Sequence, residues 1–240
     1  MLILIFSIIL VVGLLIAGSC YGNLVSVYKK YSQTDASINK DAITFVSACI
    51  KFFKLNTKIA LTEGEFQDAY LVNKDMIVLT KQVASGKSVA DIAVASHELG
   101  HALQKKEKSG WLVVDLIFKT IGKIANFLLP IALITALVFL FFEDLSMYSS
   151  IIFYISIGLW FLTILMKIAV IPLELDASKK AYKILSENKL FSREELKQTK
   201  QVLNAAALTY VGSIFFGLYR LIRKIQYSFR RDWLCIGIII

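Results

Sequence analysis

Histidine and cysteine are scarce in this chain of 240 residues, and their scarcity limits the sites that it can build. The sequence contains two histidines, His97 and His101, so a site with three histidine ligands from one chain is excluded. The three cysteines, Cys20, Cys49 and Cys235, are far apart and odd in number. They predict neither a disulfide framework nor a cysteine zinc cluster, and we assign them no role beyond filling small apolar spaces.

Charged residues are also few, and several long stretches lack them. The chain is 57% hydrophobic and 19% charged, with a mean hydropathy of +0.65, which excludes an ordinary soluble domain. Residues 2–18 carry no charge, and no Lys or Arg precedes them. A cleaved signal peptide usually begins with a basic region, so this stretch predicts an uncleaved membrane anchor.

The net charge of +9 indicates the kind of partner to expect. Basic residues beside apolar spans usually fix the orientation of a membrane protein and contact anionic lipid. No basic patch interleaved with aromatic residues lies in a polar stretch, as a nucleic-acid surface would require. We therefore predict the lipid bilayer, and not nucleic acid, as a partner.

Both histidines lie in an H-E-x-x-H motif, within a segment predicted to be a helix over residues 89–105. Residues four apart on a helix share one face, so His97 and His101 can bind the same metal ion. Glu98 follows about 100° around the turn. Its carboxylate would lie beside the metal, where it can deprotonate a metal-bound water. The motif predicts a zinc site with Glu98 as the base.

A hydrolytic zinc site needs a third protein ligand and leaves a fourth position open. Because a third histidine is missing, this ligand must be an acid, unless one of the distant cysteines supplies it. Glu174 has the best setting, since a predicted helix places it on one face with the small residues Ala177 and Ala181. The alternatives are Asp176, Asp115 and Glu107.

Three blocks of the sequence resemble the membrane-bound neutral zinc metallopeptidases of bacteria, a family typified by the YugP protein. The blocks are residues 88–104, 172–178 and 203–210. The resemblance implies a multi-pass membrane zinc peptidase of the gluzincin type with one Zn²⁺ per chain. It implies His97, His101 and Glu174 as the ligands. It also implies Glu98 as the general base. More distantly, the chain is similar to HtpX-like peptidases, which place an Asp where this chain has Ser178.

Three further residues are candidates for supporting the site. Asp176 lies close to the predicted third ligand and could orient a zinc histidine in place of the Asp of HtpX-like peptidases. Gln104 is three residues beyond His101, where it could reach the site or support packing. Tyr210 is a candidate for stabilising the developing oxyanion. Residues 67–70 stand where the family tends to carry Asp-His-Tyr-Asp, so we expect substrate contacts to differ.

We predict a mainly α, multi-pass membrane protein with a zincin-like catalytic domain of the gluzincin type. Residues 69–80 predict a β-hairpin, and its edge beside the zinc helix could pair with an extended peptide. The predicted segments are an anchor at 1–22, a first catalytic part at 23–110, a transmembrane hairpin at 111–171 and a second catalytic part at 172–240. Within the last segment, a helix at 202–222 either spans the membrane or is buried in the catalytic domain. The apolar tail at 234–240 is assigned no location.

The charge pattern around the predicted hairpin gives its orientation. Its loop carries Glu143 and Asp144 and no basic residue, whereas both outer flanks carry lysines. By the positive-inside rule, the hairpin leaves the cytosol and returns to it, so the catalytic domain is predicted on the cytosolic face of the cell membrane.

We predict that the protein hydrolyses peptide bonds in a peptide or membrane-protein substrate; the sequence does not predict its oligomeric state. One alternative is a non-catalytic membrane scaffold with a structural zinc site, which would close the metal with four protein ligands. A second is a transporter or channel subunit, which would carry charges inside its spans. A third is metal-dependent hydrolysis of a substrate other than peptide.

Overall fold

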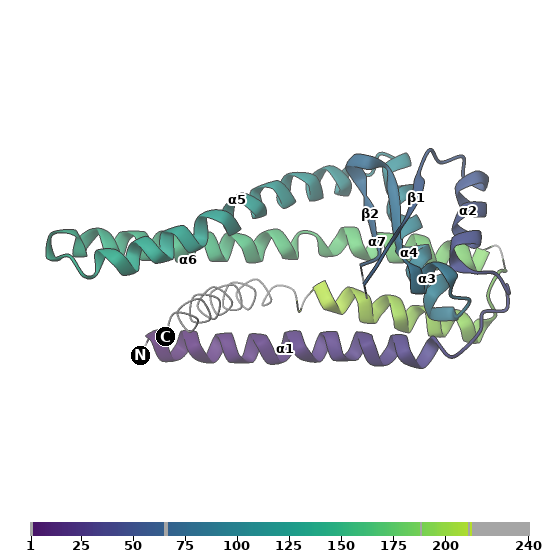
Figure 1. Ribbon diagram of the computed structural model, residues 1–240, viewed down its shortest axis with the longest axis horizontal. Helices are drawn as coiled ribbons and strands as arrows, with labels where there is room; N and C mark the ends of the chain where they lie inside the picture. The colour runs from purple at the N-terminus through teal and green to yellow at the C-terminus, as the bar shows by residue number, and fades with distance from the viewer. Residues whose placement is uncertain (1, 65–66, 188, 211, 213–240) are drawn as a thin grey trace, which may run out of the picture. The chain divides into compact units, whose positions relative to one another are not determined.

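The computed structural model in Figure 1 divides into two compact units. Unit 1 consists of residues 1–20, 117–169 and 210–240, and unit 2 consists of residues 21–116 and 170–209. The structure describes residues 2–64, 67–187, 189–210 and 212.

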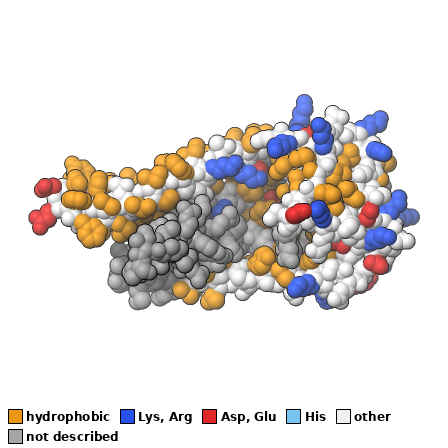
Figure 2. All heavy atoms as spheres, viewed as in Figure 1, with side chains coloured by type: hydrophobic (Ala, Val, Ile, Leu, Met, Phe, Trp, Pro, Cys, Tyr) orange, Lys and Arg blue, Asp and Glu red, His pale blue; other side chains and the backbone are white. Residues whose placement is uncertain are grey.

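Unit 1 contains a helical hairpin built from apolar residues (Figure 1). Its helices are α5 (Gly110–Phe139), which begins in unit 2, and α6 (Ser146–Ile168), joined through the short 3₁₀ helix η2 (Glu143–Leu145). The Ser149 hydroxyl donates to the carbonyl of Ala136, 2.7 Å away on the other helix. Many large apolar side chains along both helices are exposed, as the orange surface in Figure 2 shows. Such exposure is typical of helices that face lipid or a partner.

Among the described residues, three helical segments are long and apolar enough to cross a membrane. They are Val11–Tyr31, Leu112–Phe139 and Glu143–Glu187. The first belongs to α1 (Leu2–Tyr31), which continues as a helix beyond the predicted anchor. Of the predicted helix at 202–222, residues 202–210 and 212 are helical. The rest of that segment and the tail at 234–240 lie outside the described residues.

Unit 2 carries a three-stranded sheet in the order β1-β3-β2. Strands β2 (Ala69–Leu71) and β3 (Met76–Thr80) are antiparallel, which confirms the predicted hairpin. Their connection contains the 3₁₀ helix η1 (Val72–Lys74) and Asp75, which has a left-handed backbone with φ of 47°. The Asp75 carboxylate accepts hydrogen bonds from the hydroxyls of Thr57 and Tyr70, each 2.7 Å long. These bonds stabilise the turn.

Strand β1 (Lys58–Thr62) was not predicted from the sequence. It pairs in parallel with β3, with Ala60 opposite Val78. Its residues Lys58-Ile59-Ala60-Leu61-Thr62 show only weak alternation of polar and apolar side chains. Their pairing partner β3 is not the next strand, because β2 lies between them in the sequence. Because β3 is central, β1 and β2 form the two edges of the sheet.

The sheet packs with helices around a shared apolar core. The helices of unit 2 are α2 (Ala42–Phe52), α3 (Lys81–Ser85), α4 (Val89–Lys106), α7 (Ile171–Glu187) and a helix over residues 193–210, together with the end of α1. Core side chains from these elements include Phe45, Val46, Ile77, Leu79, Ile92, Leu99 and Leu185. Asp41 caps α2 by accepting from the Thr44 amide at 3.0 Å, as expected for an acid at that position.

Candidate metal centre

Helix α4 presents both histidines, and its start is fixed by a capping box. The Ser88 hydroxyl accepts from the Asp91 amide at 3.1 Å, and the Asp91 carboxylate accepts from the Ser88 amide at 3.2 Å. This arrangement satisfies backbone donors that a helix start would otherwise leave free. The helix runs from Val89 to Lys106, so the predicted span of 89–105 is confirmed. Its register places His97 and His101 on one face with their rings 4.8 Å apart.

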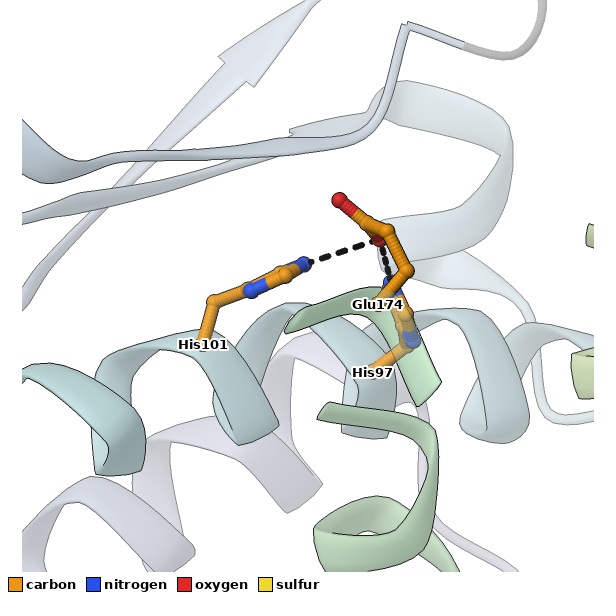
Figure 3. Close-up of side chains that lie close together, drawn as sticks. All are labelled: His97, His101 and Glu174. Carbon is orange, nitrogen blue, oxygen red and sulfur yellow. Dashed lines mark hydrogen bonds and ion pairs between the residues drawn. The ribbon is translucent and has the colours of Figure 1, made fainter. Parts of the chain in front are cut away.

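Glu174, near the start of α7, points its carboxylate at both imidazoles (Figure 3). Its Oε2 lies 3.2 Å from His97 Nε2 and 3.4 Å from His101 Nε2. The three side chains are nearly buried, with 12% of each histidine and 5% of the glutamate exposed. Within the described part of the chain, these residues form the one group of three ligand side chains able to hold a metal ion, and their ligand atoms lie within 4.8 Å of one another.

The close approach of α4 and α7 depends on small residues. Ala177 and Ala181 of α7 are fully buried. A Cβ atom on Gly100 of α4 would lie 2.5 Å from the carbonyl oxygen of Ala177, which is shorter than any real contact allows. Gly100 therefore lets the two backbones approach closely enough for Glu174 to reach the histidines.

The substitution Gly100→Ala is expected to separate the two helices at the metal centre. Overpacking of this kind typically costs about 1–3 kcal/mol. We expect a lower unfolding temperature in detergent together with weakened zinc binding, because α7 carries Glu174 away from α4. Gly110→Ala is the control, since a Cβ there meets nothing within 4 Å. An unchanged unfolding temperature and zinc affinity in Gly100→Ala would contradict this account of the packing.

Glu98 follows His97 on α4 and is buried, with 7% of the residue exposed. Burial raises the pKa of its carboxyl group above the ordinary value, although the nearby His97 and His101 partly offset that effect. Burial alone would lower the pKa of His101, but its hydrogen bond to Glu174 and the charges of Glu98 and Glu174 outweigh burial and raise that pKa to about 9. Protons and a metal ion therefore compete for the His101 imidazole.

Each histidine also has a partner on its Nδ1 side. His101 Nδ1 lies 2.9 Å from Gln104 Oε1, and the Gln104 side chain in turn contacts Asp176. His97 Nδ1 lies 3.2 Å from the Ser178 hydroxyl. Sequence reasoning considered Gln104 and Asp176 but overlooked Ser178 as a contact. Its spacing of four residues after Glu174, on the same face of α7, was the signal that could have identified it.

The structure places the other predicted candidates away from the ligand group or leaves them untested. Asp176 contacts Gln104, Glu107 forms an ion pair with Lys180, and Asp115 is buried outside the ligand group. None of these acids is part of the described cluster of ligands. The thiols of Cys20 and Cys49 are free and are not part of it either, while Cys235 lies outside the described residues.

Tyr210 belongs to unit 1, whereas the metal centre belongs to unit 2. Its predicted contact with the oxyanion stays a prediction. Residues 67–70 lead into β2, where the Asp68 carboxylate accepts from the Thr80 amide at 2.7 Å. Burial raises the pKa of Asp68, and the hydrogen bonds from Thr80 partly offset this.

Comparison with known proteins identifies the family of the chain. The family described as "Putative neutral zinc metallopeptidase" matches residues 4–228 of the chain, which is nearly its whole length. The chain belongs to this family. Among curated proteins, it is similar to "Putative membrane protease YugP" of Bacillus subtilis (strain 168), with 28% identity over 202 residues, covering 84% of this chain and 86% of that protein. No solved structure gives a significant match.

The family description implies zinc, and the three side chains can be tested for their fit to that metal. Two imidazole nitrogens and one carboxylate oxygen are ligands that Zn²⁺ commonly takes in proteins. In this family member, those three groups converge from two helices at a buried position. The donor set therefore fits zinc.

Proposed function

We propose that this protein is a membrane-bound zinc metallopeptidase of the gluzincin type, which hydrolyses peptide bonds with Glu98 as the general base. The observation that carries the proposal is the convergence of His97, His101 and Glu174, whose ligand atoms lie within 4.8 Å of one another. Glu98 is adjacent in the sequence and buried. Membership of the zinc metallopeptidase family and the similarity to a membrane protease support it.

The residues of the site would have two roles, metal binding and proton transfer. His97 and His101 would hold the metal through Nε2, with Glu174 as the third ligand. When bound, Zn²⁺ supplies a Lewis acid that polarises a carbonyl and makes water acidic near neutral pH. Glu98 would accept a proton from the attacking water and pass it to the leaving amine. Burial raises the pKa of Glu98, which favours the uptake of a proton by its carboxylate.

The sheet offers a place for an extended substrate. The strands β1 and β2 are its two edges, and Leu61 on β1 is exposed. A peptide that pairs with an edge gains main-chain hydrogen bonds without depending on its sequence. We propose that the substrate, a peptide or a segment of a membrane protein, binds in this extended form.

A non-catalytic scaffold with a structural zinc site is the second candidate. Structural zinc sites are closed by four protein ligands, whereas catalytic sites use three. The described cluster has three ligand residues. This number favours catalysis over the scaffold.

The membrane arrangement completes the proposal. Three apolar helices of spanning length support a multi-pass protein in the cell membrane. The catalytic domain, formed by residues 23–110 and 172–240, would face the cytosol. The acidic residues Glu143 and Asp144 at the hairpin turn support this orientation, because the outer flanks of the hairpin are basic.

Peptide cleavage by the purified full-length protein tests the proposal. We expect cleavage of a mixed peptide library, loss of cleavage after zinc is removed with a chelator, and recovery when one equivalent of Zn²⁺ is returned. Mass spectrometry of the products measures cleavage, and metal analysis measures the zinc content of the protein. If the protein binds zinc but cleaves no peptide, the scaffold is favoured. Cleavage that persists without metal would refute the proposal.

A further inference from the structure

The side chain of Gln104 is completely buried beside one of the two zinc histidines. It lies three residues after His101 on α4, and its Oε1 is 2.9 Å from His101 Nδ1. An amide can present either its oxygen or its NH₂ group to a neighbour, and an imidazole nitrogen can donate or accept. This pair alone therefore does not fix which group carries the hydrogen.

Two further contacts of Gln104 determine the orientation of its amide. Its Nε2 lies 2.9 Å from the carbonyl oxygen of Leu173 and 2.7 Å from Asp176 Oδ2. A backbone carbonyl and an ionised carboxylate only accept hydrogen bonds. Both N–H groups of the amide are thus used, and a flipped amide would place its oxygen against two acceptors. The Gln104 oxygen must therefore face His101.

The orientation of the amide determines the state of the imidazole. Because Oε1 only accepts, His101 Nδ1 must carry a hydrogen and donate it. In a neutral imidazole, Nε2 then has a free lone pair, and Nε2 is the atom that faces Glu174 at 3.4 Å. On the basis of the proposed function, we infer that Gln104 is a positioning residue, held by Asp176 and Leu173, that keeps His101 Nε2 available for the metal.

The other histidine is held differently. His97 Nδ1 faces the Ser178 hydroxyl at 3.2 Å, and a hydroxyl can both donate and accept. Ser178 therefore does not select one tautomer. The two imidazoles are thus supported by unlike partners, and Asp176 acts on the site through Gln104 and not by direct contact with a histidine.

The affinity for zinc is the first measurement. Loss of a hydrogen-bond partner of a metal-binding histidine typically weakens metal binding about 10–100-fold. We expect this range for Gln104→Leu in the full-length protein, measured by competition with a chromogenic chelator. Gln82→Leu is the matched control, because Gln82 is exposed on α3, and it should retain the wild-type affinity.

A double-mutant cycle tests whether Asp176 acts through Gln104. Asp176→Asn keeps an oxygen acceptor for the amide and should bind zinc nearly as well as wild type. Asp176→Leu removes the acceptor and should weaken binding, but it should add almost nothing in the Gln104→Leu background, because contacting residues are not additive. Fully additive losses would overturn the inference. The side chain of Asp176 is 36% exposed, so these changes leave the core intact.

¹⁵N NMR of the histidine ring nitrogens reports which nitrogen carries a hydrogen, and a change in packing alone would not alter that. The chain has two histidines, so ¹⁵N-histidine labelling of the zinc-loaded protein, purified without a histidine tag, gives four ring nitrogens. The Nδ1–H signal of His101 should be protected from exchange in wild type and lost or shifted in Gln104→Leu. Ser178→Ala should instead alter only the His97 signals.

An unchanged zinc affinity together with an unchanged His101 signal in Gln104→Leu would overturn the inference. These readouts do not require turnover, so they separate the inference from the proposed function. A wild-type protein that binds zinc but cleaves no peptide would refute the proposed function alone.

Discussion

Glu98→Gln is expected to lower the rate of peptide cleavage by about 10²–10⁴-fold, the range typical for loss of a general base. Zinc should remain bound, because Glu98 is not a member of the ligand cluster. Glutamine has nearly the same shape as glutamate, so it fills the same buried space but cannot accept a proton. Cleavage assays with peptide products resolved by mass spectrometry, together with metal analysis of the same sample, measure the two effects.

Glu107→Gln is the control for this experiment. Glu107 lies at the end of the same helix, and its side chain is 56% exposed and paired with Lys180. We expect full activity in that variant. Undiminished cleavage by Glu98→Gln would remove Glu98 from the mechanism, whereas loss of zinc from it would show a structural role instead.

The same substitution is also expected to preserve or raise the stability of the zinc-free protein at pH 7. Burial raises the pKa of Glu98 in the folded state above its unfolded value. A carboxyl group with a raised folded pKa lowers the free energy of unfolding once the pH exceeds the unfolded pKa of about 4.3. Glutamine carries no charge and avoids this cost. Thermal unfolding of the metal-free proteins at pH 7 measures the difference.

Glu174→Ala is expected to abolish stable zinc binding and, with it, peptide cleavage. The change removes one of three ligands and leaves His97 and His101 without the carboxylate that faces both of them. The loss should exceed the roughly 10–100-fold that follows from losing an outer hydrogen-bond partner. Metal analysis after dialysis, and chelator competition before it, measure the loss.

Two variants of the same helix serve as comparisons for Glu174→Ala. Glu187→Ala changes an exposed acid at the end of α7 and should leave zinc binding unchanged. Asp176→Ala should weaken binding, but less than Glu174→Ala, since Asp176 contacts Gln104 and not a histidine. Full zinc occupancy in Glu174→Ala would show that Glu174 is not the third ligand and that another acid supplies it.

Local sequence signals predicted the parts of the site that lie on single helices. The helix predicted over residues 89–105 corresponds to α4, and the spacing of the histidines placed both on one face of it. Glu174 could be ranked first among the acids because small residues follow it at helical spacing, and the structure brings it to the histidines. These features depend on neighbours within one or two turns, which a sequence displays directly.

The features that were missed depend on contacts between distant segments. Strand β1 is defined by parallel pairing with β3, and short strands of weak alternation give little local signal. The contact between Ser178 and His97 required knowing the distance and rotation between α4 and α7. The Gln104 side chain was considered from its position on α4, but its amide orientation depends on Leu173 and Asp176 of α7.

The order of the ligands along the chain has a consequence for biogenesis. His97 and His101 precede the α5–α6 hairpin, and Glu174 follows it. At about 5–20 residues per second, the ribosome needs several seconds to reach α7 after finishing α4. A nascent or prematurely released chain that ends before α7 carries two ligands out of three. All three candidate ligands are therefore present together only after the hydrophobic hairpin has been synthesised.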